Sequence, residues 1–203
     1  MIEVFSWLQN YPVGARAWLI CGKGPSFEKH KTIPELDEKY ATVGLNHACR
    51  ERHMLVAHMI DANVLDELPA LERQADWLLM PWQPHVQFKA TAKTLQDFVN
   101  ERADLRSFDS RGRLLWYNCS TGKAPRAGSP SVPVAMFSAE AVVRILAMAG
   151  VKTIRTLGID GGNKYASSFK DITPFRGGHT TFDGQEKYIK ATVEKFKLDY
   201  RPL

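Results

Sequence analysis

The residues with the clearest chemical potential lie in a turn near the start of the chain. The turn Gly22-Lys23-Gly24-Pro25-Ser26 follows a short apolar run, 17–20, which has the length and composition of a buried strand. Glycines at positions 22 and 24 permit a positive φ or a close backbone approach, and Pro25 fixes φ where the chain turns. A strand that runs into such a turn often presents backbone N–H groups to a phosphate, so these five residues are predicted to bind a nucleotide.

The spacing of the two glycines excludes two familiar phosphate-binding motifs. No Gly-Lys-Ser/Thr follows the turn, as the P-loop of NTPases requires. Phe27 stands where the dinucleotide fingerprint needs its third glycine. On the glycine pattern alone, the alternative is a tight turn between two elements that holds no ligand.

Three further residues are candidates because of their chemistry and their place at element ends. His179 lies in a Gly-Gly-His-Thr turn that would expose it, and imidazole titrates near neutral pH, so His179 is a candidate general base. Asp61 follows a predicted strand at the sheet edge where α/β proteins bind ligands. Ser138 opens a predicted helix, where it could cap the helix or present N–H groups to a ligand. The alternatives are a surface or capping role for His179 and a plain N-cap for Ser138.

Strand-like and helix-like segments alternate along the chain, which predicts an α/β fold with a mostly parallel, Rossmann-like sheet flanked by helices. The predicted strands are Arg16–Cys21, Ala41–Leu45, Leu55–Ile60, Trp77–Met80, Leu114–Asn118 and Thr153–Ile159. The predicted helices are Asn63–Gln74, Ala92–Ala103, Ser138–Ala149 and Gly184–Phe196, the last with an Asp-x-x-Glu capping box at Asp183. Two segments rich in glycine or proline interrupt this pattern: we expect 120–133 to be a flexible connection and 161–178 to be a lid-like loop.

Composition limits the class of protein. The chain has 203 residues, 44% hydrophobic and 24% charged, which is ordinary for a single globular domain spanning 1–203. Its net charge of +5 favours anionic partners such as nucleotides or nucleic acid, although no run of five or more Lys and Arg occurs. No apolar run is long enough for a membrane span, and the first residues do not resemble a signal peptide. Three widely separated cysteines predict reduced thiols, so a cytoplasmic location is expected.

Three motifs taken in order resemble a known family. They are the Gly22–Ser26 turn, the helix opened by Ser138-Ala139 that leads to a strand ending Gly158-Ile159-Asp160, and Gly178-His179 ahead of the last helix. This order resembles the small bacterial sialyltransferases, which carry a variant of the GT-A nucleotide-sugar fold and use a histidine base. The match covers both ends and the centre of the chain, and Ala139 stands where that family has glycine.

The resemblance implies an inverting, metal-independent glycosyltransferase that takes a nucleotide sugar, CMP-linked by family analogy, and transfers the sugar to an acceptor hydroxyl on a glycan. His179 would be the base and Tyr165 would steady the leaving phosphate. The resemblance also places Asn46, Ser138 and Asp160 at the nucleotide. No cofactor is implied beyond the nucleotide-sugar co-substrate.

The carboxylate pattern agrees with a reaction that needs no metal, and it leaves alternatives open. Many nucleotide-sugar transferases hold Mn²⁺ or Mg²⁺ through an Asp-x-Asp pair, and none occurs in this chain. His47, His53 and His58 fit no zinc spacing, so no metal ligands are assigned. The alternatives are a glycosyltransferase acting on modified bases of DNA, an ATP- and Mg-dependent pyrophosphokinase, to which the glycine turn is also similar, and a non-enzymatic nucleotide-binding module.

Overall fold

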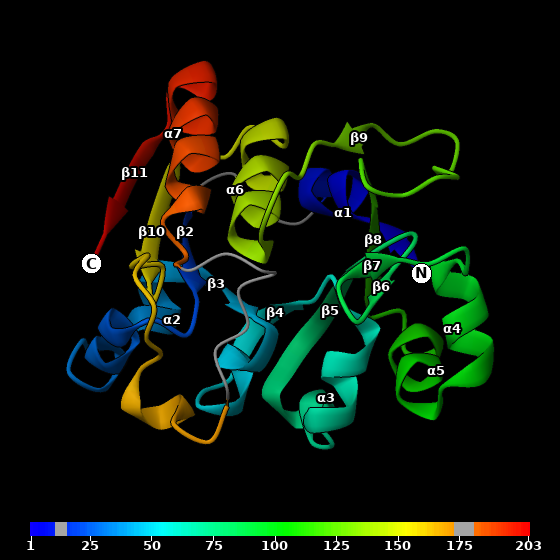
Figure 1. Cartoon of the computed structure of the whole chain (residues 1–203), viewed down its shortest axis with the longest axis horizontal. Helices are drawn as coiled ribbons and strands as arrows, with labels where there is room; N and C mark the ends of the chain where they lie inside the picture. The colour runs from blue at the N-terminus through cyan, green and yellow to red at the C-terminus, as the bar shows by residue number, and fades with distance from the viewer. Residues whose placement is uncertain (11–15, 173–180) are drawn as a thin grey trace.

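The computed structural model describes residues 1–10, 16–172 and 181–203 (Figure 1). The strands are β1 (Ile2–Glu3), β2 (Ala17–Cys21), β3 (Tyr40–Leu45), β4 (Met54–His58), β5 (Ala75–Pro81), β6 (His85–Val86), β7 (Lys89–Ala90), β8 (Leu114–Cys119), β9 (Ser131–Val132), β10 (Thr153–Leu157) and β11 (Asp199–Pro202). The α-helices are α1 (Val4–Asn10), α2 (Leu36–Lys39), α3 (Leu71–Gln74), α4 (Leu95–Glu101), α5 (Ala103–Ser110), α6 (Ser138–Met148) and α7 (Gly184–Phe196). Four 3₁₀ helices join them: η1 (Pro25–Lys31), η2 (Asn46–Arg50), η3 (Ala62–Glu67) and η4 (Ser167–Phe169).

A parallel sheet of nine strands forms the centre of the molecule. Its main path runs in the order β1-β8-β5-β4-β3-β2-β10-β11, with β9 paired to β8, and every neighbouring pair is parallel. From β2 the chain adds strands in one direction as far as β8, and it then crosses back through α6 to place β10 on the other side of β2. The order therefore reverses between β2 and β10, and open α/β sheets bind their ligands outside the carboxyl ends of the strands at such a point.

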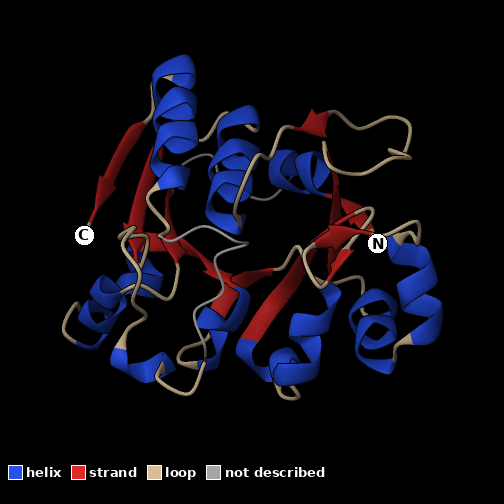
Figure 2. Ribbon diagram, viewed as in Figure 1, coloured by secondary structure: helices blue, strands red, loops and turns tan. Residues whose placement is uncertain are grey.

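Helices cover both faces of the sheet, as Figure 2 shows. One apolar core joins the sheet to α1, α6 and α7, and a second joins the opposite face to α2, α3, α4 and α5. The strands read as continuous apolar runs because both of their faces are buried. The sequence-based prediction of a mostly parallel α/β fold with flanking helices is confirmed, and each of the six predicted strands corresponds to one in the sheet.

Two local predictions are wrong, each for a physical reason. The helix expected over Asn63–Gln74 is split into η3 and α3, because Pro69 disfavours helical backbone at Leu68, whose φ and ψ are −129° and 60°. The capping box at Asp183 does not form, because the Asp183 carboxylate accepts a hydrogen bond from the Gly162 amide at 2.8 Å instead. The short edge strands β1 and β11 were not predicted, because their few residues give no clear pattern.

The turns after β2 and β10 touch through their backbones. The Gly22 amide donates to Leu157 O at 2.8 Å, and the Gly24 amide donates to Gly158 O at 2.9 Å. A Cβ atom built on Gly158 would overlap the carbonyl oxygen of Gly22, and a Cβ on Gly22 would overlap that of Gly158. The glycines are thus required by the approach of one protein backbone to another.

Replacing Gly158 with alanine is expected to destabilise the protein by about 2–4 kcal/mol, because it adds a backbone clash to a φ of +72°. Gly112→Ala is the matched control: Gly112 has a φ of +67° with nothing within 4 Å of the added Cβ, so only the backbone strain of about 1 kcal/mol is expected. Urea unfolding of the two variants measures the difference. Equal losses would show that the two turns do not need this contact.

Within the described residues, no helix is long and apolar enough to cross a membrane.

Candidate functional site

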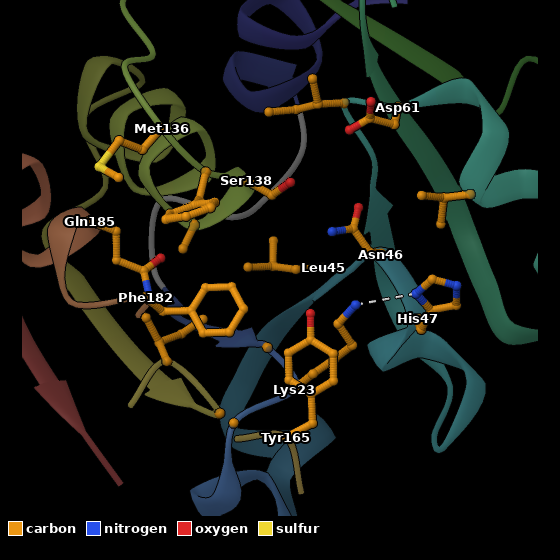
Figure 3. A pocket seen from close by; sticks show the side chains of 18 of the residues that line it. Lys23, Leu45, Asn46, His47, Asp61, Met136, Ser138, Tyr165, Phe182 and Gln185 are labelled. Atoms are coloured by element: carbon orange, nitrogen blue, oxygen red, sulfur yellow. Dashed lines mark hydrogen bonds between the residues drawn. The ribbon is translucent and has the colours of Figure 1, made fainter. Parts of the chain in front are cut away.

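A cavity of about 620 Å³ opens at the carboxyl edge of the sheet, where the order of the strands reverses. Its wall is built by the ends of β2, β3, β4 and β10, by the first turn of α6, by residues 164–165 and 171–172, and by Phe182 and Gln185 (Figure 3). This volume lies in the range of small-molecule sites in proteins.

Most of the site residues expected from the sequence line this cavity. They are Gly22, Lys23, Gly24, Asn46, Asp61, Ser138, Asp160 and Tyr165. Pro25 and Ser26 are not among the lining residues, since they begin η1 beneath the turn. His179, the expected base, lies outside the described residues.

The most distinctive group in the cavity is the ammonium of Lys23. Its Nζ lies 3.3 Å from Nδ1 of His47 and 4.5 Å from the centroid of the Tyr165 ring. His47 Nε2 lies 2.9 Å from the exposed carboxylate of Glu67. A neutral imidazole satisfies both contacts, because its Nδ1 accepts from Lys23 while its Nε2–H donates to Glu67. Figure 3 shows this pair beside Asn46, with the Lys23 ammonium directed at the His47 ring.

Burial determines the electrostatics of this pair. Desolvation lowers the pKa of Lys23 to about 8, although Glu67 partly offsets it, and Arg50 lowers it further. Desolvation and the nearby Lys23 charge lower the pKa of His47, so the imidazole is neutral at physiological pH. The protein therefore holds the Lys23 cation where water solvates it poorly, and an anionic ligand would complete its coordination.

Anion binding at Lys23 is expected to weaken above pH 8. Only the protonated amine attracts a phosphate, so affinity should be constant below the pKa of about 8 and fall by about tenfold between pH 7 and pH 9. CMP keeps one phosphate charge state in this window, because its second pKa is near 6. Isothermal titration with CMP at fixed ionic strength measures the profile. A flat profile, or the same profile in Lys23→Met, would contradict this role.

Ser26 and Asp160 pair with each other at the back of the turn. The Asp160 carboxylate accepts from the amide of Ser26 at 2.7 Å and also from its hydroxyl, and the Ser26 Oγ accepts from the Gly158 amide at 2.8 Å. These bonds fasten η1 to the end of β10. The structure thus gives both residues a part in joining the two turns, and Asp160 also borders the cavity.

Asn46 and Ser138 offer polar groups from opposite walls. Asn46 has a φ of +53°, a conformation that asparagine tolerates better than most residues, and its side chain enters the cavity directly after β3. Ser138 is the first residue of α6, and Phe137 occupies the cap position without a capping hydrogen bond. Neither side-chain polar group hydrogen-bonds to any other described residue, so both can serve a ligand near the positive end of α6.

Tyr165 belongs to a segment that is hydrogen-bonded to the turn after β2 and to η1. The Ala166 amide donates to Lys23 O at 2.7 Å, and Glu28 accepts from the amide and hydroxyl of Ser168 and from Ser167 Oγ. The Tyr165 ring stacks on Phe182, with 5.7 Å between centroids, and Phe182 in turn contacts Phe137 at 5.4 Å. These rings form an aromatic wall facing Lys23.

The far end of the cavity is built around Asp61. Its Oδ1 accepts from the amide of Phe88 at 2.8 Å, and burial raises the pKa of its carboxyl. His85 follows in the next segment, pairs with Asp61 through a backbone bridge, and places Nε2 2.8 Å from Thr121 Oγ1. Burial lowers the pKa of His85 while the Asp61 charge raises it. The cavity therefore has a cationic end at Lys23 and an acidic end at Asp61.

Four important lining residues were not predicted from the sequence: His47, Glu67, His85 and Phe182. His47 carried a signal, since it follows the expected ligand Asn46 directly after a strand. The others depend on contacts between distant segments, which no local pattern encodes.

The fold of this chain is similar to that of a solved structure. The crystal structure of the sialyltransferase CST-II in complex with a trisaccharide acceptor and CMP is similar, with a TM-score of 0.54 over 93% of this chain and 81% of that chain. The sequences are 11% identical, so the likeness shows a sialyltransferase-like fold and nothing finer. No protein-family model matches the chain, and no curated protein matches it.

Proposed function

We propose that this chain is an inverting, metal-independent glycosyltransferase that uses a nucleotide-sugar donor, CMP-linked by analogy with the sialyltransferases. The observation that carries the proposal is the desolvated Lys23 ammonium, which lies beside Tyr165 in a cavity at the switch point of a sialyltransferase-like fold. A monoester or diester phosphate is the natural partner for such a group.

The proposed roles rest on the positions of the described groups and, for His179, on the resemblance to the sialyltransferases. Lys23 would bind the donor phosphate, with the Tyr165 hydroxyl as a second donor to its oxygens. Asn46 and Ser138 would hold the nucleoside between the end of β3 and the start of α6. His179, just ahead of α7, would be the general base.

The reaction would proceed by direct displacement. An acceptor hydroxyl attacks the anomeric carbon as the bond from that carbon to the phosphate oxygen breaks, through an oxocarbenium-like transition state. The hydroxyl proton passes to His179, and CMP leaves with the bonding electron pair. The charge that develops on the leaving phosphate is stabilised by the Lys23 ammonium in a site where water screens it poorly.

A thermal-shift panel of CMP, UDP, GDP, ADP and ATP, each with and without Mg²⁺, tests the donor class. CMP is expected to stabilise the protein without metal, by about 3 kcal/mol at a hundredfold excess over its Kd. Release of CMP from CMP-sialic acid then tests turnover. Stabilisation by ATP only with Mg²⁺ would favour a pyrophosphokinase instead, and no response to any nucleotide would reject the donor site.

A further inference from the structure

The acidic end of the cavity continues into a basic and aromatic surface built from two distant segments. The first is the β6–β7 hairpin (85–90), and the second is the loop 120–130, called here the basic loop. The Ala124 amide donates to Gln83 Oε1 at 2.6 Å, and Thr121 contacts His85 Nε2 at 2.8 Å, so the two segments lie against each other.

The turn of the hairpin is held in an unusual conformation. Gln87 and Phe88 both have positive φ, 49° and 67°, which a two-residue type I′ turn requires but which these residue types disfavour. Asn63 accepts from the Gln87 amide at 3.1 Å, and Asp61 accepts from the Phe88 amide at 2.8 Å. Two side chains of the cavity wall thus hold the turn, and backbone strain of this kind is typical of functional segments.

The strained turn presents apolar surface at the rim of the cavity. Phe88 is 44% exposed and lines the cavity, and Val86 is 37% exposed. Only one other large apolar residue, Ile2, is comparably exposed in the described ranges 1–10, 16–172 and 181–203. Exposed aromatic rings at the rim of a polar site are suited to stacking on a flat ligand.

Three cations lie on these two segments without acidic partners. Lys89 follows Phe88 in the hairpin. Lys123 lies between Gly122 and Ala124, which both lie against the side chain of Gln83. The Arg126 guanidinium lies over Trp82 at 4.7 Å and over Trp116 at 4.8 Å. Across the described part of the chain, no carboxylate forms an ion pair with any of these three cations.

The basic loop is held in place, which limits the entropy lost when a ligand binds. The Asn118 side chain accepts from the Arg126 amide at 2.8 Å and donates to the carbonyls of Arg126 and Ser129. The nearby carboxylate of Glu3 accepts from Ser129 Oγ. The cations are therefore presented by a segment with a defined path, next to the cavity mouth.

We infer that this surface binds single-stranded nucleic acid, and that a hydroxyl carried by that strand is the acceptor for the cavity. The cations would contact successive phosphates while a base stacks on Phe88, which is how aromatic and basic grooves bind single strands. The surface needs no Lys/Arg run in the sequence, because Lys89 lies on the hairpin and Lys123 and Arg126 lie on the basic loop that packs against it. The acceptor part of the inference rests on the proposed function, whereas the binding part does not.

Fluorescence anisotropy with labelled 20-nucleotide oligo-dT and oligo-rU tests the binding. Three phosphate contacts predict a slope of about −2 for log K against log salt, which is about a 15-fold loss between 50 and 200 mM salt. Lys123→Gln is expected to reduce that slope by about 0.7, whereas Lys195→Gln, an exposed lysine on α7 at the opposite end of the molecule in Figure 1, is expected to leave it unchanged. Equal slopes in the two variants would overturn the assignment. The tighter of the two oligonucleotides identifies whether DNA or RNA is preferred.

The contribution of stacking is tested with Phe88→Gly. Glycine suits the positive φ at this position, so the hairpin should fold at least as well while binding of the oligonucleotide weakens by about 5- to 150-fold. Heparin, a polyanion without bases, is the matched ligand, and its affinity should not depend on Phe88. If Phe88→Gly weakens neither ligand, or weakens both equally, the surface is an anion site of another kind and the inference is wrong.

CMP titration of the same variants separates this inference from the proposed function. Normal CMP binding with no oligonucleotide binding would overturn the inference alone. Oligonucleotide binding without any nucleotide response would overturn the donor site and leave the surface standing.

Discussion

Replacing Lys23 with methionine is expected to weaken nucleotide binding strongly and at the same time to make the free protein more stable. The ammonium is desolvated in the cavity, and the fall of its pKa from 10.5 to about 8 corresponds to a cost of roughly 3 kcal/mol for keeping it charged in the folded state. Because the unfolded chain binds the proton more tightly, this cost is fully present below pH 8 and is relieved as pH rises toward 10.5. Methionine fills similar volume without the charge.

The size of both effects follows from the contacts that are lost. The His47 hydrogen bond and the Tyr165 ring contact offset part of the gain, so a net stabilisation of roughly 1–2 kcal/mol is expected, or about 2–8 °C in Tm for a chain of this length. Loss of a buried charge partner should weaken CMP binding by at least about 30-fold. Calorimetry and CMP titration measure the two quantities on one sample.

Lys164→Met is the matched control, because Lys164 also lines the cavity but is exposed to solvent. Its removal should change Tm little and reduce affinity only modestly. If Lys23→Met lowered Tm, the lysine would be a structural residue. If CMP bound it as tightly as the wild type, the cationic end would not be the phosphate site.

The sheet could be predicted from the sequence because each central strand is buried on both faces. Such strands are short apolar runs between breakers, and their alternation with helices restricts the topology to a parallel sheet. The carboxyl ends of these strands then supplied Lys23, Asn46 and Asp61 as site candidates, and all three line the cavity. These three residues could be placed at the cavity from the sequence because each directly follows a strand that has a clear local pattern.

The remaining parts of the site depend on contacts between segments distant in the chain. Asp160 hydrogen-bonds to Ser26, which lies 134 positions earlier in the chain. His47 lies in a 3₁₀ helix that the sequence pattern did not predict, and from there it contacts Glu67. The break in the helix between β4 and β5 could be anticipated from the sequence, because Pro69 lies at that point. Pairwise geometry of this kind follows from packing and register, so it appears first in the folded structure.

Replacing His179 with alanine is expected to stop transfer while leaving the donor bound. A positioned general base contributes about 10²- to 10⁴-fold to the rate, so CMP release from CMP-sialic acid should fall by that factor while the Kd for CMP stays within about twofold. The pH–rate profile should also lose its acidic limb, because that limb reports protonation of the imidazole. Water serves as the acceptor in this assay, so the result does not depend on knowing the natural one.

Three other histidines make the result specific. His53 directly precedes β4 at the amino edge of the sheet, away from the cavity, so His53→Ala should have no effect on rate or binding. His47→Ala removes the contact to Lys23 and should weaken CMP binding more than it slows turnover. If His47→Ala or His85→Ala stopped turnover and His179→Ala did not, the base would belong to the cavity wall itself. The proton would then pass to a neutral imidazole whose pKa burial has already lowered, and the reaction would need a different route for its acceptor.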